Sequence, residues 1–442
     1  MQSVNTIASR VWSFILLVLL GGSGTVVAQD NFPLSRYGLG DMFPMSNINN
    51  RGMGHISASY ADNQTINFIN PASYAQLKFS ALDIGLDVNS RTLRNRDADR
   101  YTSNNAIIPY VGIGVPLKTK KEKFFGALVF GLRPITRVSY NIQGLTSANS
   151  GDSLGVTYTG SGGTYQAFTG AGFSLKNLSV GLNFGYRFGS KELVSKVDVL
   201  TSNAFFSRGR FTSLTSYGGA FAEAGFQYRI PLNKDEENRS SFNVGAYANL
   251  LTQMNASRDE SYETVTFDGR GNEIRIDSVS VVKNIAGTIL FPRYYGFGIA
   301  YEKSGRFIIG ADYVMHQWSG YRYYGQTDQL RDAWTLKLGA QFIPPANSNS
   351  KSYWNNVAYR TGFIYGQEPY LVNGDMRSYA ITIGFGLPVR RWNMYSYQNT
   401  LVNTAFEFGQ RGNNESLLHE SYFRFSLGFS LADVWFIKRK YD

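Results

Sequence analysis

The chain has 442 residues, 43% of them hydrophobic, and a formal net charge of +11. It contains no cysteine, which excludes a disulfide scaffold and thiolate metal sites. Lysine and arginine are dispersed with no basic helix or stripe, so no nucleic-acid partner is expected, and the positive charge favours anionic lipid head groups instead. The 46 glycines, 29 tyrosines and 31 phenylalanines are typical of strands with aromatic girdles and small residues facing a lumen.

Residues 1–28 are expected to form a cleaved signal peptide. Arg10 closes a weakly basic start, and the apolar run 11–20 (VWSFILLVLL) is too short to span a bilayer as a helix. Val26-Val27-Ala28 then offers small residues for cleavage. Beyond residue 28 no apolar run approaches about 18 residues, so a later spanning helix is not expected. An exported chain of this kind crosses a membrane only as a closed β-barrel, because lipid leaves no partner for unpaired backbone groups.

Residues 29–78 show little periodicity and are rich in glycine and asparagine. The notable positions are Gly52, Gly54, Asp62, Asn63 and the tripeptide Asn70-Pro71-Ala72. Glycine permits conformational shifts at little steric cost. Asp62, Asn63 and Asn67 are expected to offer hydrogen bonds to a surrounding wall, although Asn-Pro also fits an ordinary turn. Because this segment immediately precedes the first strand, we expect it to lie in the lumen or in the periplasm.

Runs of alternating apolar and polar residues begin near residue 79 and recur up to residue 431. In 333–343 one face is apolar, and the other carries Thr335, Lys337, Gly339 and Gln341, the pattern of a wall between lipid and a polar lumen. The predicted strands are 79–94, 104–117, 123–141, 164–175, 178–199, 213–230, 241–258, 292–303, 306–318, 333–343, 352–366, 377–388, 397–410 and 418–431. The prediction is an all-β, fourteen-stranded antiparallel transmembrane barrel, an even number as in bacterial single-chain barrels.

The lengths of the connections depend on whether they follow an even-numbered or an odd-numbered strand. Those after even strands are short, and the long ones, 142–163 and 259–291, follow odd strands. Short turns are periplasmic and long loops extracellular, so both ends of the barrel (79–431) should face the periplasm, as should the basic tail 432–442. Residues 259–291 alternate about an Asp-Gly turn, which predicts a hairpin above the rim. Two further wall strands, sixteen in all, remain the alternative.

The order of four motifs resembles the FadL/TodX family of outer-membrane hydrophobe transporters. The first is the Gly52-to-Ala72 stretch, followed by 163–187, by 292–321 with Trp318, and by 332–369 with Arg360-Thr361-Gly362. The resemblance implies that residues 29–78 form a hatch that plugs the lumen and shifts to admit ligand. It also implies that Gly52, Gly54, Asp62, Asn63, Asn70, Pro71 and Ala72 belong to that hatch.

Pro134 lies inside the third predicted strand. Proline removes a ladder hydrogen bond, so a bulge or a break in pairing is expected there. The resemblance implies an inward kink that opens a lateral window, lined by Gly131, Leu132, Arg133, Pro134 and Arg137. A proline just above the membrane band is the alternative.

Aromatic residues cluster in the segments expected outside the cell. Most fit an interfacial girdle. Some could form a shallow groove that captures an apolar ligand, with an arginine pairing a carboxylate. The candidates are Phe291, Arg293, Tyr294, Trp318, Tyr321 and Arg322.

No catalytic, metal-binding or cofactor-binding motif is found, and His55, His316 and His419 are far apart in the sequence. The leading hypothesis is passive uptake of fatty acids or aromatic hydrocarbons through a Gram-negative outer membrane, with hatch gating and lateral exit near Pro134. The alternative is a barrel that serves as a protein-interaction component of outer-membrane secretion or assembly machinery. Expected partners are outer-membrane lipids, lipopolysaccharide, a hydrophobic small molecule and, for the alternative, outer-membrane proteins.

Overall fold

The structure, a computed structural model, describes residues 31–95, 100–118, 124–147, 153–200, 208–233, 239–268, 270, 272–303, 305–345, 352–371, 375–389, 399–412 and 418–433. The predicted signal peptide and residues 434–442 of the predicted tail lie outside these ranges. No helix among the described residues is long and apolar enough to cross a membrane.

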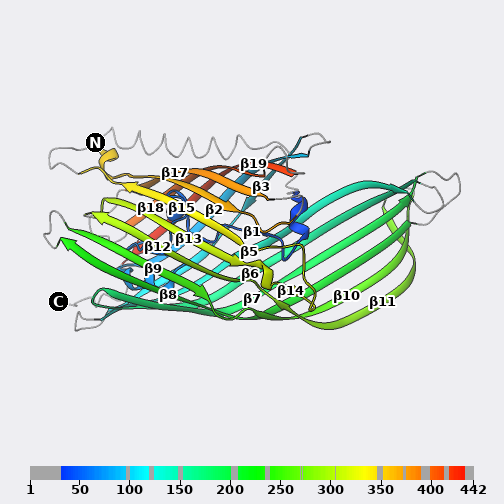
Figure 1. The fold of residues 1–442 in the computed structure, drawn as a ribbon, viewed down its shortest axis with the longest axis horizontal. Helices are drawn as coiled ribbons and strands as arrows, with labels where there is room; N and C mark the ends of the chain where they lie inside the picture. Colours follow the sequence, from blue (N-terminus) through cyan, green and yellow to red (C-terminus); the bar gives the residue numbers. More distant parts are fainter. Residues whose placement is uncertain are drawn as a thin grey trace, which may run out of the picture.

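The described residues form a closed antiparallel barrel with 14 wall strands (Figure 1). Consecutive strands pair as hairpins, and β19 closes the barrel by pairing with β2 from Asp433↔Ser80 to Leu418↔Asn95. Three wall strands are interrupted and carry two labels each, namely β3 with β4, β9 with β10, and β11 with β12. The strands are β2 (Ser80–Asn95), β3 (Tyr101–Ile107), β4 (Val111–Lys118), β5 (Phe124–Ser147), β6 (Ser153–Leu175), β7 (Leu178–Val199), β8 (Arg208–Asn233), β9 (Ser240–Asn249), β10 (Gln253–Phe267), β11 (Glu273–Leu290), β12 (Arg293–Lys303), β13 (Phe307–Gln317), β15 (Ala333–Phe342), β16 (Ala358–Gln367), β17 (Arg377–Val389), β18 (Asn399–Arg411) and β19 (Leu418–Asp433).

The predicted strand count is confirmed, and the sixteen-strand alternative is wrong for the described residues. Two local predictions need correction. The expected loop 142–163 is largely strand, because β5 and β6 continue to Ser147 and from Ser153 as a paired ladder. Residues 352–357 are not strand, since a 3₁₀ turn, η4 (Tyr353–Asn356), precedes β16.

The wall reverses the usual distribution of polarity. On β7 the outward side chains of Leu182, Phe184 and Tyr186 are exposed, whereas the inward Asn183 and Arg187 are fully buried. The same alternation follows neighbouring strands. It is the arrangement of a barrel whose outside is apolar and whose interior is polar.

The barrel is much taller on one side. Strands β5 to β8 have 22 to 26 residues, whereas β12, β13, β15 and β16 have only 10 or 11. The hairpin of β10 and β11 extends this tall side beyond the rim, where β10 pairs with both β8 and β11 (Figure 1). The predicted hairpin in 259–291 is therefore confirmed as a continuation of two wall strands.

Residues 31–79, called the inner segment below, lie inside the barrel. They contain two 3₁₀ turns, η1 (Pro33–Arg36) and η2 (Pro71–Gln76), the short strand β1 (Asp41–Met42) and one helical turn, α2 (Ile48–Arg51). Helix α2 contacts β17, β18 and β19, whereas η2 contacts β5, β6, β7 and β8. Contacts with opposite sides of the wall show that the segment crosses the lumen. A last short strand, β14 (Arg322–Tyr323), lies in the loop after β13 and pairs with β11.

Candidate functional site

Helix α2 places a buried arginine against the wall. Asn47 caps the helix by accepting a hydrogen bond from the backbone N–H of Asn50 at 3.0 Å. Arg51, in the last turn, forms an ion pair with Asp87 of β2, and both side chains are 1% exposed. Arg51 also donates to the carbonyl oxygens of Ser46 and Pro44, each at 2.9 Å. The guanidinium therefore joins the wall to the chain that leads into α2.

The two predicted hatch glycines allow backbone-to-backbone contact with the wall. Gly52 ends α2, and Gly54 has a φ of 65°, which favours glycine. Thr382 of β17 bonds both, since its hydroxyl accepts from the Gly54 N–H at 2.9 Å and donates to the Gly52 carbonyl at 3.2 Å. A Cβ added at Gly362 of the wall would lie 2.1 Å from the Gly54 nitrogen. The wall at this level therefore has no room for a side chain.

The tripeptide Asn70-Pro71-Ala72 forms the second anchor. Asn70 caps η2 through its side chain, which accepts from the Ala72 N–H at 3.1 Å. Its amide group also lies within 3.1 and 3.3 Å of the carbonyl oxygens of Phe226 and Ala246 on the wall. Glycines face the tripeptide and the chain before it as well. A Cβ would approach inner-segment backbone to 2.6 Å or less at Gly172, Gly181 and Gly245.

Asp62 and Asn67 do not bond the wall as expected. Asp62 accepts from the N–H groups of Gln64 and Thr65 at 2.7 and 2.9 Å, and Asn67 donates to carbonyls within the inner segment. Asn63 has an exposed side chain, and its carbonyl accepts from the Lys78 N–H at 2.9 Å. The prediction of wall contacts is therefore wrong for Asp62 and Asn67, because these polar groups close a local turn.

A wall carboxylate supplies that contact instead. Asp312 of β13 accepts from the backbone N–H groups of Ser57 and Ala58 at 2.6 and 2.8 Å. Glu223 of β8 is the centre of a second cluster. Gln166 and Asn183 donate to it at 3.0 and 3.2 Å.

Arg133, expected at a lateral window, belongs to the Glu223 cluster. It is 2% exposed, lies 3.3 Å from the Glu223 carboxylate and donates to the Met45 and Phe68 carbonyls of the inner segment. Tyr294 donates to Glu223 as well. Two other expected window residues lie away from the cluster: Leu132 is exposed on the wall, and Gly131 lies against the Phe168 ring.

The wall is discontinuous beside Pro134. A register shift between Pro134 and Thr136 in the β5–β6 ladder leaves Ile135 as the extra residue, which confirms the predicted bulge. Strand β4 pairs with β5 only from Lys118↔Phe125 to Val111↔Leu132. Among the described residues, β3 pairs with β2 and makes no pairing with β5. A gap therefore separates β3 from the part of β5 that follows Leu132, which is called the upper part of β5 below.

The start of the inner segment covers the edge of β5 at this gap. Strand β1 pairs with Thr136 and Arg137, and the N–H of Phe43 donates to the Ile135 carbonyl at 2.9 Å. Further along, the N–H of Phe32 donates to the Ser139 carbonyl at 2.8 Å. The backbone groups that β3 leaves unpaired on β5 thus bond to the inner segment.

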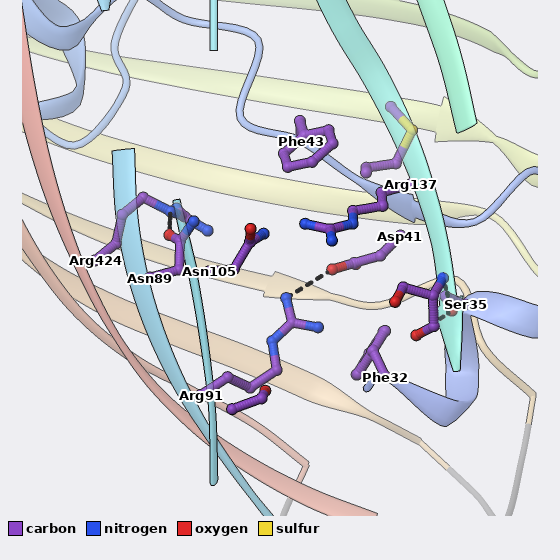
Figure 2. A pocket seen from close by; sticks show the side chains of 12 residues that line it. Phe32, Ser35, Asp41, Phe43, Asn89, Arg91, Asn105, Arg137 and Arg424 are labelled. Carbon is purple, nitrogen blue, oxygen red and sulfur yellow. Dashed lines mark hydrogen bonds and ion pairs between the residues drawn. The ribbon is translucent and has the colours of Figure 1, made fainter. Parts of the chain in front are cut away.

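Two adjoining cavities open at the gap. The outer one, called the wall notch below, has a volume of about 270 Å³ and is lined by Phe43, Asn105, Ala106, Ile107, Thr136, Arg137, Gly162 and Tyr165. The inner one, of about 20 Å³, shares three of these residues, Phe43, Asn105 and Arg137 (Figure 2). Figure 2 shows Arg91, Arg137 and Asp41 turned toward this inner space.

Asp41 of β1 holds two wall arginines. Its carboxylate lies 2.9 Å from Arg91 of β2 and 2.8 Å from Arg411 of β18. Burial alone would raise the pKa of Asp41, but the two guanidinium groups outweigh it and hold the pKa below its ordinary value. Asp41 is therefore a carboxylate that ties the inner segment to two wall strands.

The predicted ligand-capture residues fall into two groups. Phe291, Tyr294, Trp318 and Tyr321 are all buried and belong to one apolar cluster with Leu34 and Leu39 of the inner segment. Arg293 is exposed on β12, and Arg322 donates to carbonyls of its own loop. The four aromatic side chains thus pack against the inner segment, and their role in ligand capture stays a prediction.

His55 is the histidine that reaches a charged wall residue. Its ring lies 2.7 Å from the Ser46 hydroxyl and 3.2 Å from Glu407 of β18. Arg424 of β19 lies 2.9 Å from the same carboxylate. Burial lowers the pKa of His55, although Glu407 opposes the effect. A neutral ring that donates through Nε2 and accepts through Nδ1 fits both neighbours.

Sequence reasoning missed most of these tethers, namely Arg51, Asp87, Glu223, Asp312, Asp41 and the His55–Glu407 pair. A signal for some of them is present. Asp87, Glu223 and Asp312 each fall on the inward phase of an alternating strand, where an isolated carboxylate needs a partner. The alternation does not say which residue supplies that partner.

A comparison with models of protein families matches residues 11–442 to the model of the BamG family. The chain belongs to the BamG family. A comparison with curated proteins finds no match.

Solved structures with a similar fold include hydrocarbon channels and transporters. The CymD monoaromatic hydrocarbon channel superimposes with a TM-score of 0.55 at 16% identity, over 88% of this chain and 98% of that one. A FadL homologue from Pseudomonas aeruginosa gives 0.51 at 11% identity, over 90% and 100%. The Ralstonia pickettii toluene transporter TbuX gives 0.52 at 13% identity, over 88% and 98%. This BamG-family chain therefore has the FadL-like barrel fold of outer-membrane hydrophobe transporters, and identities this low carry the fold alone.

Proposed function

We propose that this protein is an outer-membrane barrel, exported by residues 1–28, that acts as a protein-interaction component of secretion or assembly machinery. In this proposal residues 29–78 are a fixed plug, the wall 79–431 spans the outer membrane, and the tall side faces the cell exterior. The surrounding lipids and lipopolysaccharide are its other partners. No catalytic role is proposed.

The observation that carries this proposal is the way the inner segment is held. Its backbone packs directly on wall glycines, and Arg51–Asp87 is a fully buried ion pair. Breaking one buried ion pair costs about 3–5 kcal/mol. A shift of the plug that opens a path through the lumen would break several such contacts at once, so spontaneous gating is disfavoured.

The tall side of the barrel supports a docking role. On β11 every residue from Ile274 to Asn284 is exposed, and Val279 has an exposed fraction of 72%. Ile274, Ile276, Val281 and Val282 add further exposed apolar surface beyond the rim. Apolar surface gathered at one place on a protein is a common sign of an interaction site.

The test is purification of the full chain from mild detergent, with and without the β10–β11 tip. A variant in which Asn-Gly replaces residues 261–281 would join the register partners Glu260 and Val282 through a tight turn. We expect the wild-type protein to retain stoichiometric outer-membrane partners and this variant to lose them. As a matched control, the β5–β6 tip is shortened between the paired residues Ile142 and Tyr158. Monomeric wild-type protein after gentle extraction and cross-linking would contradict the proposal.

Passive uptake of fatty acids or aromatic hydrocarbons is the second candidate. It is favoured by the gap beside Pro134, which would offer lateral exit, and by the fold shared with hydrocarbon channels. Radiolabelled oleate and toluene uptake in a deletion strain tests it. Unchanged uptake would reject this candidate, whereas uptake restored by the wild-type gene but not by a variant lacking Ile135 would support it.

A further inference from the structure

The wall notch opens on the outside of the barrel and has a polar lining on both banks. Asn105 lies on the β3 bank, and Thr136 and Arg137 lie on the β5 bank. A volume of about 270 Å³ is about nine times the share of one water in the liquid. That is room for a compact charged group and is far too small for a folded domain.

Positive charge continues inward from the notch. Arg137 lines both cavities, and Arg91 and Arg424 line the inner one together with a single carboxylate, Asp41. Asp41 lies within 2.9 Å of two guanidinium groups, Arg91 also pairs with Glu420 at 2.8 Å, and Arg424 pairs with Glu407. The inner cavity also contains the hydroxyl of Ser103, which is 5% exposed and has no hydrogen-bond partner in the structure. This lining suits a group with several acceptor oxygens and negative charge.

The outward side chains place the notch at the edge of the apolar band. Tyr165, one of its lining residues, stacks on Phe188 with ring centroids 6.1 Å apart, and both are exposed. On β2 the outward residues change from apolar, at Leu86 and Val88, to polar, at Ser90 and Thr92. Aromatic residues followed by polar ones mark the interface between lipid tails and head groups.

We propose that the wall notch is a binding site for the phosphate of an anionic lipid head group, with Arg137 as its main contact. Asn105 would donate a further hydrogen bond to the phosphate oxygens, and the lipid tails would lie along the outer wall beside Tyr165. The inference does not depend on the proposed function, since either a docking barrel or a channel could carry such a lipid.

The test uses the full chain in nanodiscs of phosphatidylcholine containing a small fraction of lipid A, with bound lipid A measured by native mass spectrometry. Arg137→Gln is expected to bind lipid A at least about tenfold more weakly, because a charge-assisted hydrogen bond is lost. Arg137→Lys should keep part of the binding, since it keeps the charge but not the bidentate geometry. Arg293→Gln is the matched control, because it removes an exposed arginine from β12, several strands away from the notch. A heat-dependent mobility shift on gels verifies that each variant folds.

Three outcomes would overturn the inference. The first is equal lipid A binding by Arg137→Gln and Arg293→Gln. The second is displacement of lipid A by millimolar inorganic phosphate, which would make the notch a site for free phosphate. The third is a photo-crosslink from Asn104 of β3 to a polypeptide rather than to lipid, which would show that the gap receives a strand of another protein.

Discussion

The two parts of the inner segment are held in different ways. Residues 44–79 lie deep in the barrel, where Arg51 and Asp87 are 1% exposed and glycines bring the wall backbone into contact. Residues 31–43 lie beside the gap, where main-chain hydrogen bonds to β5 and the pairs of Asp41 hold them, at 12–15% side-chain exposure. The deep part is therefore held by buried ion pairs and by close packing of its backbone on wall glycines. The part at the gap is held by main-chain hydrogen bonds like those between neighbouring strands.

Because of this difference, the contacts that hold the segment in the lumen are separate from those that control access to the wall notch. The deep part crosses the lumen, and any movement there would leave buried charges without their partners. The part at the gap replaces the missing neighbour of β5 and forms one bank of the wall notch. A change in access to the notch can therefore occur without opening the lumen.

The largest expected effect follows from breaking the deep ion pair. Arg51→Met leaves Asp87 buried without its partner, and we expect the free energy of unfolding to fall by about 3–5 kcal/mol. Arg91→Met should cost clearly less, because both carboxylates that Arg91 contacts, Asp41 and Glu420, keep Arg411 as a partner. Urea unfolding of both variants in detergent micelles, followed by tryptophan fluorescence, compares the two. Equal losses would contradict the distinction between the two parts.

The glycine contacts should be next in size. Gly181→Val places a side chain where the Pro71 backbone lies 2.3 Å from an ideal Cβ, so the deep part must shift. We expect a loss of about 1–3 kcal/mol, the usual cost of overpacking, together with faster proteolysis of the inner segment. Gly144→Val is the matched control, since nothing lies within 4 Å of its Cβ position. Proteolysis at the wild-type rate in Gly181→Val would show that the wall yields instead.

Removal of the bulge should act on the gap alone. Deletion of Ile135 restores continuous register between β5 and β6 and should draw the upper part of β5 toward β3. Because the chain contains no cysteine, a single Asn105→Cys reports access to the notch through its reaction with a membrane-impermeant thiol reagent. We expect severalfold slower labelling in the deletion variant. Val279→Cys, on the exposed tip, should label equally in both backgrounds.

The smallest effect concerns His55 of the deep part. Its pKa is lowered in the folded protein, so below about pH 6.5 the unfolded chain takes up a proton that the folded one refuses. Stability should therefore be complete above that pH and should fall as the pH drops below it, by at most about 1.4 kcal/mol per pH unit. His55→Gln should remove this part of the slope between pH 5 and 7 in thermal unfolding. An unchanged slope would mean that His55 is charged in the fold.

The sequence alone determined the wall. Alternation with period two predicts which side chain faces outward and which faces the interior, and a proline within a strand predicts a bulge. The strand number, the hairpin order and the irregularity at Pro134 were therefore all predictable. Segment 29–78 carries no such period. Its anchors join residues that are hundreds of positions apart, such as Gly54 with Thr382 and Ala58 with Asp312.

Only the tertiary structure decided which polar groups meet. Arg133 and Arg137 are four residues apart on one strand, yet the bulge between them helps send one to the Glu223 cluster and the other to the wall notch. The sequence also did not predict the height of the tall side. A polar, β-prone composition fits both a loop and an extended hairpin, so composition cannot distinguish the two. Local sequence fixes the phase of a strand, whereas partner choice across a lumen depends on the curvature and closure of the whole barrel.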